Sequence, residues 1–108
     1  MEQEINRFLT ILYGLQKINP EFPLQYIICL AEIAQNEGLS LTDLADKTGM
    51  PLSTVSRITA ALSAHKKNGK AYNLITVTIA PQERRRKQLF LNKNGKDVVR
   101  RIAYLIQS

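Results

Sequence analysis

The chain lacks several residue types on which common functions depend. Its 108 residues include no tryptophan, one cysteine and one histidine. A single cysteine excludes an internal disulfide and a cysteine-rich zinc site, and a single histidine excludes most histidine-based metal sites. Four tyrosines and three phenylalanines give no evident aromatic platform for stacking unpaired bases. We therefore expect neither a cofactor nor a bound metal.

Long apolar runs are also missing, since none approaches the roughly 20 residues that cross a membrane. The first residues, Met1-Glu2-Gln3-Glu4, are acidic, whereas a secretory leader begins with basic residues. With 44% hydrophobic residues, a chain of this length can bury the core of one domain. We expect a single domain over 1–108, in the cytoplasm and associated with the nucleoid, with no membrane partner.

Residues that commonly carry catalysis form no recognisable pattern. We find no carboxylate pair, glycine-rich phosphate loop or nucleophile–base pair. Asp43 and Asp46 are better explained as charges at the start of a helix than as a metal site. Cys29 lies among apolar residues, where a cysteine usually acts as a small buried hydrophobe rather than a redox sensor. We do not expect an enzyme.

Basic residues outnumber acidic ones, 15 to 9, and the charges are unevenly distributed along the chain. Residues 1–56 carry three basic and seven acidic side chains, a net charge of −4. Residues 57–108 carry twelve basic and two acidic side chains, a net charge of +10. Such asymmetry within one small domain favours a polyanionic partner on one face, although basic surfaces also serve solubility.

Hydrophobic periodicity predicts a mostly α-helical chain with one small β-hairpin. The expected helices cover about residues 3–18, 23–36, 41–48, 51–65 and 93–107, and the expected strands cover 74–79 and 87–91. The helix over 23–36 is apolar nearly all round, so we expect it to be the buried central helix. The order of elements is that of a winged helix-turn-helix.

The helix-turn-helix itself spans about residues 41–57. Ser40 and Asp43 resemble a capping box at its start, and Gly49 permits the left-handed turn between its two helices. Val55 and Ile58 would anchor the second helix in the core. The residues left at its outward N-terminal end are candidate DNA contacts: Leu52, Ser53, Thr54, Ser56 and Arg57.

A second candidate site is the tip of the hairpin, about residues 81–87. Four consecutive cations, Arg84, Arg85, Arg86 and Lys87, follow Glu83 there. Because like charges repel, folding alone gives no reason for them, and such a tip can enter the narrow, electronegative minor groove. A solvated basic loop is the alternative. Lys66, Lys67 and Lys70, between the helix and the hairpin, are candidate phosphate contacts.

Over about residues 20–107 the chain resembles the MarR family of winged-helix regulators. The matching stretches are Leu44-Ala45, Gly49, Ser53-Thr54-Val55-Ser56-Arg57, Leu62, Leu74-Ile75, Glu83-Arg84-Arg85 and Leu91-Asn92-Lys93-Asn94-Gly95. The helix-turn-helix alone is shared with other bacterial regulators, including the IclR type. Glu83 replaces the family's usual Asp, and Pro51 stands where the family often has a capping Ser. The short chain resembles regulators carried by phages and mobile elements.

The resemblance implies a homodimer on double-stranded DNA. The helix over 51–65 of each subunit would lie in successive major grooves, and Arg85 would enter the minor groove. Because the chain is shorter than is usual in the family, the terminal helices within 1–19 and 93–108 are left to form the dimer interface.

Three functions therefore compete. The first is a sequence-specific transcriptional regulator of the repressor kind. The second is a winged-helix protein-interaction module, which would not need the cationic tip. The third is a replication or partition protein of a mobile element, which would bind repeated sites at an origin rather than at a promoter.

Overall fold

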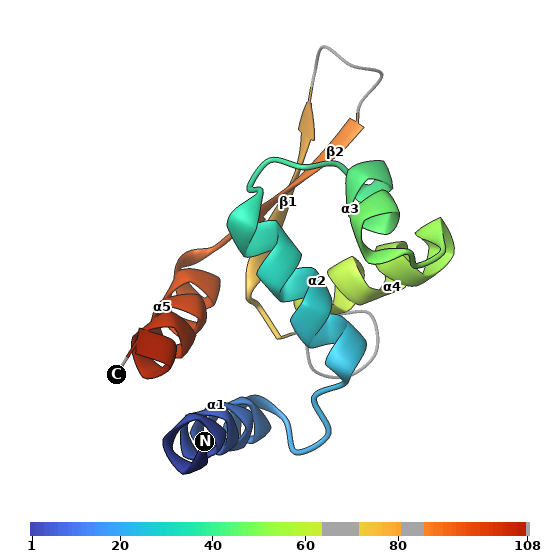
Figure 1. Cartoon of the computed structure of the whole chain (residues 1–108). Helices are drawn as coiled ribbons and strands as arrows, with labels where there is room; N and C mark the ends of the chain where they lie inside the picture. The colour runs from blue at the N-terminus through green and yellow to red at the C-terminus, as the bar shows by residue number, and fades with distance from the viewer. Residues whose placement is uncertain (64–71, 81–85, 108) are drawn as a thin grey trace.

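The computed structural model describes residues 1–63, 72–80 and 86–107 of the chain. Within them lie five helices and one two-stranded antiparallel sheet (Figure 1). The helices are α1 (Glu2–Ile18), α2 (Leu24–Gln35), α3 (Leu41–Thr48), α4 (Leu52–Leu62) and α5 (Lys93–Gln107), and the strands are β1 (Ile75–Ala80) and β2 (Arg86–Leu91). The predicted fold class, mostly α with a small hairpin, is confirmed.

The core lies where α2, α3, α4 and the base of the hairpin meet. α2 occupies the centre, with α3 and α4 on one side and α5 on another (Figure 1). The buried apolar side chains of this core are Cys29, Leu30, Ile33, Leu39, Leu44, Val55, Ile58, Leu62, Leu74, Ile75, Leu89 and Leu91. Their burial supplies the main driving force that holds the helix-turn-helix to the sheet.

Two expectations differ from the structure. α2 is buried along one face only, through Cys29, Leu30 and Ile33, and Leu24 remains 70% exposed. The helix expected over 51–65 ends at Leu62. Ser63 has an extended backbone (ψ −177°), which stops the helix, and residues 64 and 65 lie outside the described ranges.

The hairpin is attached to the loop between α2 and α3. β1 and β2 pair from Ile75 opposite Leu91 to Ala80 opposite Arg86. The Gly38 N–H donates to the Leu89 carbonyl at 2.7 Å, and the Leu89 N–H donates to the Leu39 carbonyl at 2.9 Å. These bonds satisfy backbone groups that an isolated hairpin would leave open, and they fix the hairpin relative to the start of α3.

The two terminal helices lie against each other, away from the end of the hairpin at which Ala80 pairs with Arg86 (Figure 1). Leu15 is the one buried residue of α1. Several large apolar side chains of α1 are at least 36% exposed: Ile5, Phe8, Leu9, Leu12 and Tyr13. In the part of the chain that the structure describes, no helix is both long and apolar enough to cross a membrane.

Candidate nucleic-acid interface

α3 is capped by local structure at both of its ends. At its start, the Asp43 N–H donates to the Ser40 hydroxyl at 3.0 Å, and the Ser40 N–H donates to the Asp43 carboxylate at 3.3 Å. The predicted capping box is therefore complete. At the end of α3, Gly49 adopts the predicted left-handed conformation, with φ +72°.

Thr48 is a turn residue that the sequence analysis missed. Its hydroxyl donates to the Leu44 carbonyl at 2.8 Å and accepts from the Met50 N–H at 3.3 Å. It therefore links the last turn of α3 to the residue that leads into α4. A threonine directly before a turn glycine was the available signal, since hydroxyl side chains often bond nearby backbone groups there.

The first turns of α4 present the predicted contact residues to solvent. Ser53, Ser56 and Arg57 are exposed, Leu52 is 51% exposed, and Thr54 is half-buried. The opposite face of α4 is buried in the core through Val55, Ile58, Thr59 and Leu62. The structure thus brings all five predicted residues together at one end of a helix whose other face is fixed.

Pro51 precedes the start of α4 and has no side-chain group that could accept from the first N–H groups of the helix. No side chain caps the helix there, and Val55 is the first residue of the segment whose N–H reaches back, to the Pro51 carbonyl at 3.1 Å. As at any helix start, the amides of Leu52, Ser53 and Thr54 have no acceptor inside the helix. These N–H groups can donate to a negatively charged oxygen of a bound ligand, such as a phosphate oxygen, and the helix dipole favours such an anion.

Two of the four cations predicted at the tip of the hairpin, which we call the wing, lie among the described residues. Arg86 and Lys87 are exposed at the start of β2, opposite Ala80 and Ile79 of β1. Arg86 also forms a salt bridge within the protein, because its Nη2 atom lies 3.7 Å from the Asp43 carboxylate. The remaining predicted contacts lie outside the described residues: Lys66, Lys67, Lys70, Arg84 and Arg85.

Asp43 therefore joins the capping box to the wing. The hydrogen bond from the Ser40 N–H has the largest effect in lowering the pKa of the Asp43 carboxyl, and the hydrogen bond with the Ser40 side chain comes second. The positive charges of Arg86 and Lys47 lower this pKa further. The carboxylate is consequently ionised when it caps α3 and pairs with Arg86. The Cys29 thiol behaves oppositely, since burial raises its pKa, with a further contribution from Glu32.

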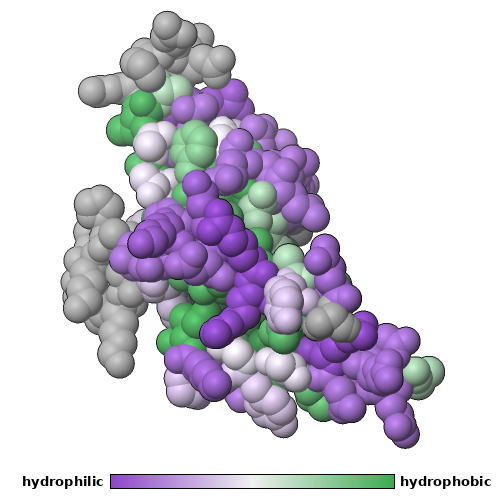
Figure 2. Space-filling model, turned by 90° about the vertical axis from the view of Figure 1, so that its left-hand side faces the viewer, coloured by the Kyte–Doolittle hydropathy of each residue, from purple (hydrophilic) through white to green (hydrophobic). Residues whose placement is uncertain are grey.

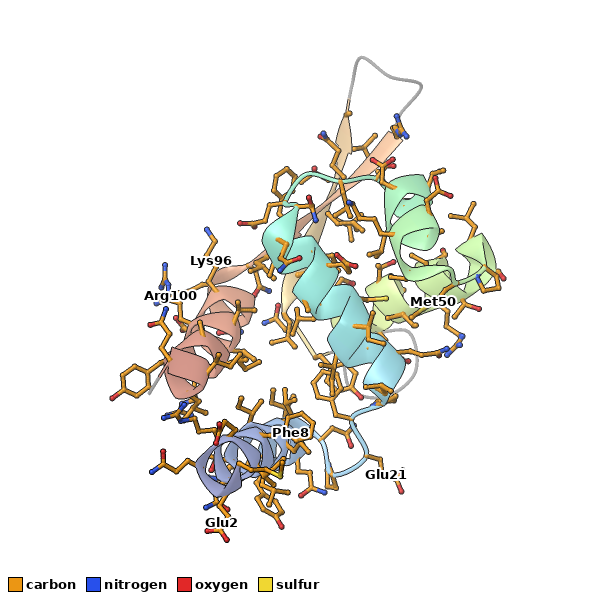
Figure 3. All side chains as sticks on the ribbon, viewed as in Figure 1. Glu2, Phe8, Glu21, Met50, Lys96 and Arg100 are labelled. Atoms are coloured by element: carbon orange, nitrogen blue, oxygen red, sulfur yellow. The ribbon has the colours of Figure 1, made fainter. Side chains whose placement is uncertain are left out.

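α5 adds a basic surface that was not among the predicted contacts. Seen from the side of α5, the molecular surface is largely hydrophilic (Figure 2). Lys96 and Arg100 point away from α1 and α2 (Figure 3), and Arg100 lies 3.8 Å from the carboxylate of Asp97. Lysine or arginine at positions 93, 96 and 100 was the available signal, because this spacing places the three on one face of a helix.

No cluster of three or more potential metal-ligating side chains occurs among the described residues. A groove of about 480 Å³ lies between α1 and α5. Its lining is mainly apolar, with Lys17, Asp97 and Arg101 as charged members.

The helix-turn-helix segment matches a known family model. Residues 29–66, from the middle of α2 through α4, match the IclR helix-turn-helix domain. No curated protein matches the chain.

Solved structures match over almost the whole chain. RV1404 from Mycobacterium tuberculosis has a TM-score of 0.76 and 20% identity, covering 94% of this chain and 64% of its own. A MarR-family transcriptional regulator from Silicibacter pomeroyi has a TM-score of 0.63 and 19% identity, covering 94% and 65% respectively. The chain has a MarR-like winged helix-turn-helix fold. A third structure of this fold, the transcriptional repressor CouR bound to a 23-mer DNA duplex, has a TM-score of 0.69 and 21% identity, covering 97% and 68%.

Within the MarR-like fold, α3 and α4 form the helix-turn-helix and the β1–β2 hairpin forms the wing. The chain spans about two thirds of the length of each of these three structures. The predicted resemblance to MarR-type regulators is thereby confirmed at the level of the fold.

Proposed function

We propose that the chain is a sequence-specific, double-stranded DNA-binding transcriptional regulator that acts as a repressor. The observation that carries this proposal is the start of α4, where exposed polar side chains and open backbone amides project from a helix that the core holds in place. The net charge of +10 on residues 57–108 supplies attraction to phosphates. We propose no enzymatic activity and a location in the cytoplasm, on the nucleoid.

In this proposal the two halves of the site read different grooves. Ser53, Thr54, Ser56 and Arg57 lie in the major groove, where short hydroxyl side chains allow close approach and an arginine reaches base edges. The segment from Arg84 to Lys87 enters the minor groove. Lys66, Lys67 and Lys70 contact phosphates along the backbone.

The regulator acts as a homodimer that uses α1 and α5. The apolar side chains that α1 exposes, including Phe8 at 57% exposure, form a surface that association with a second copy would cover (Figure 3). A two-fold dimer would place one α4 at each of two half-sites about one helical turn apart.

A mobility-shift series in increasing salt tests the proposal, with the DNA upstream of the gene as probe. If about six to eight phosphates are neutralised, log K falls with log salt at a slope near −6 to −7. A random duplex of the same length and composition is the control. Equal affinity for both duplexes would remove the claim of sequence specificity.

A further inference from the structure

Three residues before the hairpin, Tyr72–Leu74, connect α4 to both terminal helices. We call this segment the junction. α4, the loop after α1, and the start of α5 each form hydrogen bonds with it.

Toward α4, the junction bonds to the last carbonyls of the helix. The N–H groups of Tyr72, Asn73 and Leu74 donate to the carbonyls of Ala61, Ser63 and Leu62, at 3.1, 3.3 and 2.8 Å. Carbonyls at a helix end have no partner within the helix, so these bonds satisfy them and fix the direction of α4.

Toward α1, the junction bonds through one side chain. The Asn19 Nδ2 group donates to the Tyr72 hydroxyl at 2.9 Å, while the Asn19 Oδ1 atom accepts from the Glu21 N–H at 2.8 Å. Both ends of the Asn19 amide are thus used. The Tyr72 ring stacks on Phe22 with centroids 4.9 Å apart and packs edge-on against Tyr26 at 5.7 Å.

Toward α5, the junction bonds through asparagines. The Asn92 Nδ2 group donates to both the backbone carbonyl and the side-chain oxygen of Asn73, each at 2.9 Å. Asn73 has a left-handed backbone, with φ +57°, which asparagine tolerates better than most residues. Asn92 also caps α5 by accepting from the Gly95 N–H at 2.9 Å.

We propose that Asn19 and Tyr72 are positioning residues that determine which half-site spacing the protein accepts. α1 buries only Leu15 and packs against α5, and the bond between Asn19 and Tyr72 adds a constraint on its direction relative to α2 and α4. In a dimer formed through α1 and α5, the angle at the junction fixes the separation of the two α4 helices. Adding one base pair moves a half-site by about 3.4 Å and rotates it by about 35°. A stiff junction therefore rejects a spacing that a loose junction accepts.

This inference rests on the proposed function, and Tyr72→Phe tests it directly. The variant removes the hydroxyl but keeps the stacked ring. Tyr26→Phe is the matched control, because within the described part of the chain the Tyr26 hydroxyl forms no hydrogen bond. Duplexes selected by the wild-type chain are rebuilt with one base pair added or removed between half-sites. The readout is the ratio of affinities for the best and altered spacings.

We expect the wild-type chain and Tyr26→Phe to share one ratio, and Tyr72→Phe to lower it about threefold to tenfold, as one lost hydrogen bond predicts. Asn19→Ala should have the same effect. A wild-type ratio retained in both Tyr72→Phe and Asn19→Ala would overturn the inference, as would a wild-type chain indifferent to spacing. A loss of affinity at all spacings with an unchanged ratio would also count against it.

A measurement without DNA separates this inference from the proposed function. Spin labels at Gln3→Cys in α1 and Lys47→Cys in α3, in chains diluted with unlabelled protein, report the distance between the two helices. Cys29 is fully buried, and labelling of the parent chain gives the background. Tyr72→Phe should broaden the distance distribution. An unchanged distribution would contradict the proposed positioning of α1 by Tyr72. A chain that binds no duplex but shows this broadening would contradict only the proposed function.

Discussion

Gly95 is the residue at which the fold leaves no room for a side chain. A Cβ atom there would overlap the backbone carbonyl oxygen of Leu74. We predict that Gly95→Ala destabilises the chain by about 1–3 kcal/mol, because either α5 or the junction must move. Urea unfolding measures the change. Gly14→Ala is the control, since no described atom outside the neighbouring backbone of α1 lies within 4 Å of a Cβ there, and it should stabilise α1 by up to about 1 kcal/mol. Equal effects of the two variants would contradict this packing.

Arg57 is the residue that we expect to contribute most to base recognition. It is exposed on α4 next to Ser56, and its side chain is long enough to reach base edges. We predict that Arg57→Ala relaxes preference at one or two base pairs, by about 1–3 kcal/mol at each. Lys67→Ala should instead weaken all sequences alike and reduce the salt slope by about 1. Binding to a library of single-base variants distinguishes these outcomes, and a uniform loss in both variants would contradict the role of Arg57.

For individual residues, local sequence rules predicted those whose partners are close in the sequence. Ser40 with Asp43, the left-handed Gly49 and the buried Val55 and Ile58 each follow from spacing and residue type. Tyr72 could not be predicted in the same way. Its hydroxyl bonds to a residue 53 positions away, and no periodicity or motif encodes that contact.

α3 is the element whose stability should respond most clearly to pH. The Asp43 pKa is lowered in the folded chain, so the ionised carboxylate contributes stability above its unfolded pKa of about 3.9. That contribution is lost as the pH falls through the folded value. We predict that Asp43→Asn lowers the urea midpoint at pH 7 and that the difference from wild type closes below about pH 4.

Comparison of the two chains at each pH isolates Asp43, because every other carboxylate titrates in both. A difference in urea midpoint that stays constant between pH 7 and pH 3 would show that Asp43 adds no charge-dependent stability. The amide introduced by Asp43→Asn keeps an oxygen that can accept from the Ser40 N–H, so the shape of the cap is preserved.

Most element boundaries could be predicted to within one or two residues, because periodicity, Gly49 and the cap residues mark them locally. The end of α4 could not. Ser63 leaves the helix because the junction supplies donors for the carbonyls of Ala61, Leu62 and Ser63, and those donors come from beyond residue 71. The pairing of residues 38–40 with β2 was missed for a similar reason, since Gly38-Leu39-Ser40 shows no strand-like alternation.

For the whole molecule, the exposed apolar face of α1 predicts association. Phe8 is 57% exposed, so replacing it should change the stability of a single chain by no more than about 0.5 kcal/mol. We predict that the wild-type chain sediments as a dimer at micromolar concentration and that Phe8→Asp sediments as a monomer with its helical content retained. A monomeric wild-type chain, or a Phe8→Asp dimer of unchanged affinity, would contradict the use of α1.

The proposed function requires that this fold recognises particular DNA sequences. Selection from a random duplex pool, followed by affinity measurement at about 0.15 M salt against a shuffled duplex of equal length, tests it most directly. Specific sites are typically bound about 10³-fold or more tightly than non-specific ones, and we expect a preference of about that size here. A pool that converges on no sequence, with equal affinities for selected and shuffled duplexes, would contradict sequence-specific binding.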